Sequence, residues 1–229
     1  MRKRDLKNET VLEYLTQRSL LKQDVFEVSK KSFSLFKERL EKKITDFLSQ
    51  SKSDRVRLKY DEKGDFESHA FVGSDLLIFN MHTNVFCFPP EHSIWKTSYV
   101  EKDRDLAYCG VIHIYNFLSD SFLQGRLNDS GYLLGRIYIN KENHFFIEGK
   151  GELGFRYRDF INAEFTEQVM DEVIDSAICH AAEFDLLTPP AEMISTVSVQ
   201  QMQVYSSSLQ LKTAKRLGFR FNADSEKLV

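Results

Sequence analysis

The sequence predicts a single α+β domain in which an antiparallel β-sheet of about six to eight strands is covered by a long N-terminal helix and a C-terminal helix. Apolar residues recur at helical spacing in residues 1–50 and again after residue 163, whereas they alternate with polar residues through much of residues 55–158. Short turns, and not crossover helices, join the predicted strands, which makes the sheet antiparallel. No long linker interrupts the chain, so we expect one domain over residues 1–229, with a helical segment at 1–50, mainly sheet at 55–158, and C-terminal helices with a basic tail at 163–229.

Two helices are predicted before the sheet. Asn8 is a suitable N-cap for a short helix that begins around Val11. A longer helix is predicted from about Asp24 to Leu48, where apolar residues recur at steps of three and four among lysines and glutamates. The sheet that follows needs a cover, which favours packing of this helix on the sheet. In the alternative, residues 24–48 pair with a second copy, and the protein is a homo-oligomeric structural or assembly protein.

The predicted strands are separated by turn-forming sequences. Residues 106–118 are apolar on both faces, which is typical of a strand near the middle of a covered sheet. Residues 84–88 are expected to form a buried strand that ends at Pro89. An apolar stripe predicts a helix from about Thr166 to Leu186. The remaining predicted strands are 56–60, 66–72, 76–81, 132–140 and 144–149.

The composition excludes disorder for most of the chain, since 42% of the residues are hydrophobic and 19 are Phe. The N-terminus lacks the apolar stretch of about 7–15 residues that a secretion signal needs, and no window approaches the ~18 apolar residues of a membrane span. The three cysteines, Cys87, Cys109 and Cys179, lie far apart in apolar runs, as is typical of reduced thiols. We therefore expect a soluble cytoplasmic protein without membrane association.

Charge is distributed unevenly along the chain. Residues 1–63 carry 17 Lys and Arg against 11 Asp and Glu, whereas residues 64–190 carry 9 against 20. A basic end on an acidic body is either an ordinary solvated surface or a docking surface for an acidic partner or nucleic acid. Within the predicted C-terminal helix, Glu167, Asp171 and Asp175 form an acidic row at intervals of four residues, which is either solvated or directed at a partner.

One short pattern resembles the active-site motif of a nuclease superfamily. Asp129 precedes a hairpin whose second strand ends in Glu148 and Lys150, and a helix follows. This arrangement resembles the PD-(D/E)xK motif, which implies that two carboxylates hold Mg²⁺ and that the lysine orients or activates water for phosphodiester hydrolysis. The resemblance defines an alternative function, that of a Mg²⁺-dependent nuclease with Asp129, Glu148 and Lys150 as its catalytic residues.

His113 marks the most apolar predicted strand as a candidate binding site. It shares a strand face with Cys109 and Tyr115, and a buried imidazole needs a hydrogen-bond partner from the core or from a ligand. Trp95, the single tryptophan, lies in the connection before this strand. The favoured interpretation is a non-catalytic module that binds a small ligand or a protein partner, with His113, Tyr115, Cys109 and Trp95 as binding residues.

The remaining motifs predict no cofactor. The six histidines lack the spacing of a structural zinc site, and HExxH and CxxC are missing from the sequence. We therefore expect no bound metal, with Mg²⁺ implied by the nuclease alternative alone. Nucleic acid is a possible partner of the basic and aromatic tail, but it is not favoured, because four charges over ten residues are ordinary. The cations of that tail are Lys212, Lys215, Arg216 and Arg220.

Overall fold

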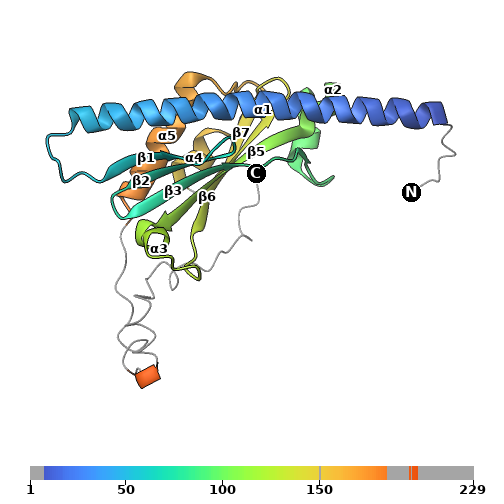
Figure 1. Cartoon of the computed structure of the whole chain (residues 1–229). Coiled ribbons are helices and arrows are strands. Elements are labelled where there is room, and N and C mark those ends of the chain that lie inside the picture. Colours follow the sequence, from blue (N-terminus) through green and yellow to red (C-terminus); the bar gives the residue numbers. More distant parts are fainter. Residues whose placement is uncertain (1–7, 150, 185–195, 197, 201–229) are drawn as a thin grey trace.

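The computed structural model describes residues 8–149, 151–184, 196 and 198–200 (Figure 1). Its helices are α1 (Asn8–Gln50), α2 (Ser98–Lys102), α3 (Ser119–Leu123), α4 (Gly151–Arg156) and α5 (Glu167–Ala182), with 3₁₀ turns η1 (Ser93–Lys96) and η2 (Arg104–Ala107). Its strands are β1 (Leu58–Glu62), β2 (Glu67–Val72), β3 (Asp75–Met81), β4 (Phe86–Cys87), β5 (Tyr108–Leu118), β6 (Tyr132–Asn140) and β7 (Phe145–Gly149).

The strands form one seven-stranded antiparallel sheet, as the sequence predicts. Their order is β1-β2-β3-β5-β6-β7, and β4 pairs with β5 off this path. The helix α1 crosses one face of the sheet (Figure 1), and α5 packs into the same apolar core. The predicted α+β class, with a long N-terminal helix and a C-terminal helix covering an antiparallel sheet, is therefore confirmed.

The N-terminal segment is one unbroken helix of 43 residues, so the prediction of two separate helices is wrong. Residues 16–23, which join the two predicted helices, contain neither Gly nor Pro, and nothing in them ends a helix. At a rise of about 1.5 Å per residue, α1 is about 65 Å long. Its first turns extend past the sheet (Figure 1), and Val11, Leu12 and Leu15 are exposed there.

The apolar side of α1 is buried on the sheet. Phe33, Phe36 and Leu40 are fully buried, and the rings of Phe36 and Phe79 on β3 have centroids 5.2 Å apart. Complete burial of an aliphatic or aromatic side chain of this size stabilises the fold by about 1.5–3 kcal/mol. Because the sheet takes this side of residues 24–48, the same side is not available for pairing with a second copy.

A glycine on β5 sets the closest approach of α1 to the sheet. A Cβ atom built on Gly110 would lie 2.2 Å from the Oγ and 2.6 Å from the Cβ of Ser29. Ser29 is fully buried, and its hydroxyl donates to the Val25 carbonyl oxygen at 2.7 Å. The helix therefore rests on the backbone of β5 at this point, and no larger residue fits between them.

We expect Gly110→Ala to lower the free energy of unfolding by about 1–3 kcal/mol, because it overpacks the contact between α1 and β5. Urea denaturation measures the effect. The control is the same substitution in the Ser29→Gly background, which removes both of the atoms that the new methyl group meets. Gly110→Ala should cost less in that background, and an equal cost in both backgrounds would show that the contact is not the cause.

Ion pairs join basic side chains of α1 to acidic side chains of α5. Arg39 makes two hydrogen bonds to the Asp171 carboxylate, one from Nε at 2.9 Å, and a third from Nη1 to Glu167 at 3.0 Å. Lys43 donates to Asp175 at 2.8 Å. The acidic row of α5 thus faces basic residues of α1 within the same chain. A bidentate arginine–carboxylate pair is directional, so it also sets the orientation of the two helices.

The pair of Arg39 and Asp171 should make the free energy of unfolding depend on pH. The hydrogen bond from Arg39 lowers the pKa of Asp171, so its contribution is complete above the unfolded pKa, near 4, and is lost as the pH falls through the lower folded value. We expect Asp171→Asn to cost about 0.5–1 kcal/mol at pH 7 and progressively less below about pH 4. Urea denaturation at several pH values tests this. Asp54→Asn, at an exposed carboxylate, is the matched control, and a pH-independent cost of Asp171→Asn would contradict the account.

One predicted strand is shorter and more exposed than expected. Residues 84–88 were predicted to form a buried strand, but β4 comprises two residues, and both are exposed. The prolines at 89 and 90 follow directly and cannot donate to a ladder, which limits the pairing.

None of the helices in the described part of the chain combines the length and the apolar character that a membrane crossing requires.

Candidate functional site

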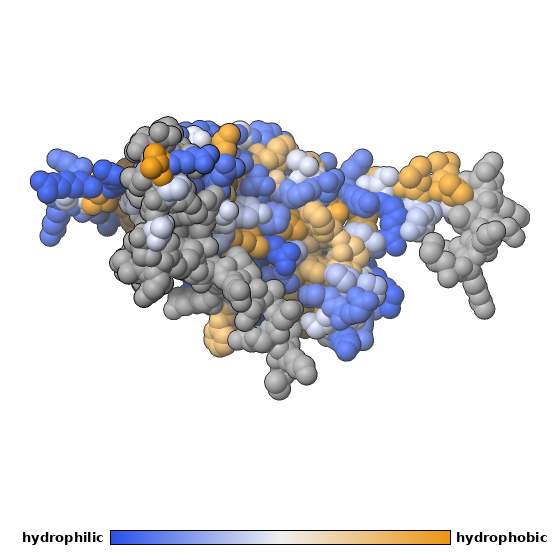
Figure 2. Space-filling model, turned by 90° about the horizontal axis from the view of Figure 1, so that it is seen from below, coloured by the Kyte–Doolittle hydropathy of each residue, from blue (hydrophilic) through white to orange (hydrophobic). Residues whose placement is uncertain are grey.

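A short segment covers one end of the sheet face opposite α1. This cover segment runs from Phe88 to Ala107 and contains η1, α2 and η2. Its residues Ile94, Val100 and Leu106 form an apolar cluster with side chains of β5, β6 and β7. Figure 2 views the molecule from this side and shows hydrophobic groups next to hydrophilic ones. Two pockets lie at the margins of the cover segment.

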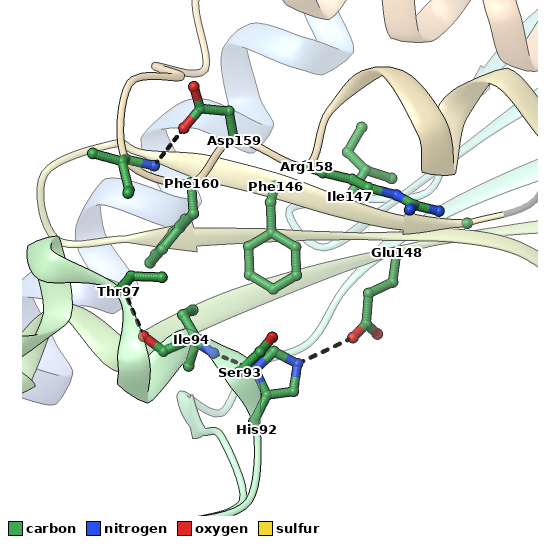
Figure 3. Close-up of a pocket in the computed structure, with 12 residues that line it drawn as sticks. His92, Ser93, Ile94, Thr97, Phe146, Ile147, Glu148, Arg158, Asp159 and Phe160 are labelled. Atoms are coloured by element: carbon green, nitrogen blue, oxygen red, sulfur yellow. Dashed lines mark hydrogen bonds and ion pairs between the residues drawn. The ribbon is translucent and has the colours of Figure 1, made fainter. Parts of the chain in front are cut away.

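The larger pocket has a volume of about 440 Å³ and lies between η1, β7 and residues 158–161 (Figure 3). Its wall is largely apolar, with Ile94, Phe146 and Phe160 among its lining residues. Phe146 meets Phe160 edge to face, with ring centroids 5.3 Å apart, so the two rings hold each other in place. A preformed pocket of this size that combines aromatic walls with polar side chains is typical of a small-molecule site.

The loop before η1 places His92 at the polar end of this pocket. The Trp95 indole donates to the Pro89 carbonyl oxygen at 2.8 Å, and the Nδ1 atom of His92 accepts from the backbone N–H of Ile94 at 3.2 Å. Because Nδ1 is an acceptor, the neutral ring carries its proton on Nε2. That atom lies 3.7 Å from Glu148 Oε1, beyond the usual N–H···O distance of about 2.7–3.2 Å. The Nε2 proton is therefore left for a closer acceptor.

The β6–β7 hairpin positions Glu148. The Asn140 side chain accepts from the backbone N–H groups of Glu142 and His144, and the resulting register sets Glu148 opposite Arg136. One carboxylate oxygen of Glu148, Oε2, accepts from Arg136 at 2.5 Å and from the Tyr138 hydroxyl at 3.0 Å. Burial, followed by the negative charge of Glu148, raises the pKa of Tyr138, so its hydroxyl stays a donor. The other oxygen faces His92.

Two glycines in contact position Arg158 on the opposite wall. A Cβ atom on Gly154 would lie 2.0 Å from the Gly149 carbonyl oxygen, so α4 rests directly on the end of β7. The Nε of Arg158 donates to the Gly154 carbonyl oxygen at 2.7 Å. Within the described part of the chain Arg158 forms no ion pair. Figure 3 shows its side chain extending toward the end of the pocket that holds Glu148.

His113 lines a smaller pocket, of about 170 Å³, next to the ionic cluster that Arg136, Tyr138 and Glu148 form. His113 lies opposite Arg136 in the register of β5 and β6, and Arg136 and Tyr138 line this pocket with it. Burial, followed by the positive charge of Arg136, lowers the pKa of His113. The Arg136–Glu148 pair therefore lies between the two pockets, since Arg136 lines the smaller one and Glu148 the larger one.

The four predicted ligand-binding residues are not gathered at one point. His113 lines the smaller pocket, and Tyr115 stacks against it with ring centroids 5.7 Å apart but lines neither pocket. Cys109 is fully buried in the cluster under the cover segment, where burial raises the pKa of its thiol. Trp95 uses its indole N–H on Pro89, so its part is to hold the loop that carries His92.

The carboxylates of the nuclease alternative have different partners. Asp129 lies in the loop before β6, where it accepts from Ser121 at 2.8 Å and pairs with Arg126 at 3.3 Å. Glu148 is held by Arg136 and Tyr138, and Lys150 lies outside the described residues. Both acidic groups thus already face an arginine, a poor starting point for holding Mg²⁺. Among the residues that the structure describes, no three His, Cys, Asp or Glu side chains are arranged to hold a metal.

The basic tail lies outside the described residues, so its predicted nucleic-acid contacts stay a prediction; they involve Lys212, Lys215, Arg216 and Arg220.

Comparisons with known proteins offer no precedent, since no family, curated protein or solved structure matches the chain. The candidate site therefore rests on its geometry alone.

Sequence reasoning singled out Glu148 but missed the groups around it. The partner Arg136 could have been predicted, because a turn at residues 141–143 implies the register that places it opposite Glu148. No pattern in the sequence pointed to His92 or Arg158 as residues of one site. They are 66 positions apart, and only the packing of the cover segment against residues 158–161 places them at one pocket.

Replacing Arg136 should change the titration of His113. Because the Arg136 charge contributes to the low pKa of His113, Arg136→Met should raise that pKa. The measurement is the pH titration of the His113 ring signals by NMR. Arg55→Met removes an arginine from the exposed α1–β1 loop and should leave the His113 titration unchanged. A His113 titration that is the same in Arg136→Met and in the unchanged protein would contradict the described contact.

Proposed function

We propose that the protein is a non-catalytic module that binds a small molecule in the larger pocket. The observation that carries this proposal is the combination of a pocket of about 440 Å³ with apolar walls and, at one end, His92, Glu148 and Arg158. The apolar walls supply binding free energy by removing ligand surface from water, and the few polar groups select the ligand and its orientation.

The hydrogen bonds at the polar end support a role in binding. His92 uses Nδ1 to hold η1 and offers a hydrogen-bond donor at Nε2. Glu148 is held by hydrogen bonds from an arginine and a tyrosine. Groups that are held in place by such hydrogen bonds suit the recognition of a ligand.

The test is a titration with 8-anilinonaphthalene-1-sulfonate, a dye that becomes fluorescent in apolar pockets. We expect saturable binding to one site in the folded protein. Ile161→Trp should weaken dye binding at least tenfold. Ile161 lines the pocket with 37% of its surface exposed, and the larger tryptophan side chain would fill the opening.

Leu127→Trp is the matched control, since Leu127 is 94% exposed and lies away from the pocket. Urea denaturation of both variants verifies that they are folded, because partly unfolded chains also bind this dye. Dye binding that is missing from the unchanged protein, or that Ile161→Trp and Leu127→Trp affect equally, would refute the proposal.

A further inference from the structure

The geometry points to the chemical class of the ligand: an organic monocarboxylate with a flat apolar body. We infer that its carboxylate is bound between Arg158 and the Nε2 proton of His92, while its body lies against Phe146 and Phe160. This inference rests on the proposed function, because it assigns a ligand class to the same pocket.

The first argument is the balance of charge around the pocket. Glu148 is compensated by Arg136 and Tyr138. The Asp159 carboxylate accepts from the backbone N–H groups of Ile161 and Asn162 and from the Asn162 side chain. These hydrogen bonds lower the pKa of Asp159, and its side chain points away from Phe146 in Figure 3. Of the charged groups that line the pocket, the one that faces no opposite charge in the described part of the chain is therefore a cation, whose contacts there are the Gly154 carbonyl oxygen and the Phe155 ring, 5.9 Å from its guanidinium carbon.

That cation is Arg158, and its geometry suits a carboxylate. Its Nε donates to Gly154, which fixes the plane of the guanidinium group and leaves the four N–H bonds of the two Nη atoms. A planar pair of N–H donors matches the two oxygens of a carboxylate, and charge-assisted bonds of this kind are stronger than neutral ones. His92 supplies a further donor from the opposite wall, at the N-cap of η1.

The position of the two donors separates the charged head of the ligand from its body. Arg158 is exposed, whereas Phe146 and Phe160 are buried, at 8% and 4% exposed surface. A carboxylate bound at Arg158 therefore keeps part of its hydration, which limits the cost of desolvating a charge. The two aromatic rings then contact a flat apolar body, and the volume of about 440 Å³ has room for a fused bicyclic ring.

Three probes with one body and different charges test the inference: naphthalene-2-carboxylate, naphthalene-2-carboxamide and naphthalene-2-carboxamidine. Isothermal titration calorimetry on the full chain gives the affinity of each. We expect the carboxylate to bind at least tenfold more tightly than the neutral carboxamide, and the cationic carboxamidine to bind most weakly. Arg158→Gln should reduce the carboxylate to the affinity of the carboxamide and leave the carboxamide unchanged.

Arg156→Gln is the matched control, because it removes an equal charge only two residues from Arg158. The Arg156 side chain pairs with Glu172 at 3.9 Å and does not line the pocket. Arg156→Gln should preserve the preference for the carboxylate. Equal binding of carboxylate and carboxamide, tighter binding of the carboxamidine, or a preference that survives Arg158→Gln would overturn the ligand class while leaving pocket binding intact. If no probe and no dye binds to the pocket, the proposed function fails as well.

Discussion

The burial of α1 on one face of the sheet is the interaction on which the rest of the molecule depends. Gly110 lets the helix approach the backbone of β5, and the Arg39–Asp171 pair orients it against α5. Buried area drives this docking, whereas the ion pair, which is partly exposed, contributes direction more than stability. Two helices close one face of the sheet, and two pockets lie on the opposite face at the margins of its short cover segment.

The cover segment and the ionic cluster complement each other. A charged group on an otherwise aromatic sheet face is costly unless it is paired, and the Arg136–Glu148 pair, supported by Tyr138, meets that requirement. The cluster keeps one edge of the cover polar, so that the larger pocket has an apolar wall and a charged end. The smaller pocket shares the cluster through Arg136, which lies opposite His113 in the register of β5 and β6.

Local patterns predict the elements of this fold well and the site poorly. Alternation and turns predicted the antiparallel sheet, and the apolar stripe of residues 24–48 predicted the covering helix, because both signals arise from neighbours in the sequence. The unbroken length of α1 was missed, although residues 16–23 contain neither Gly nor Pro to end a helix. Glu148 was selected for a nuclease motif, whereas its partners and the role of Arg158 depend on long-range packing that sequence spacing does not encode.

The most direct test of the account is to locate a bound probe by methyl NMR. Isoleucine methyl groups label both sides of the sheet: Ile94 and Ile161 line the pocket, whereas Ile44 and Ile112 lie in the core under α1. A titration with naphthalene-2-carboxylate should shift the signals of the two pocket isoleucines and leave those of the two core isoleucines unchanged. Shifts confined to the core signals, or no shift of the pocket signals, would contradict the account.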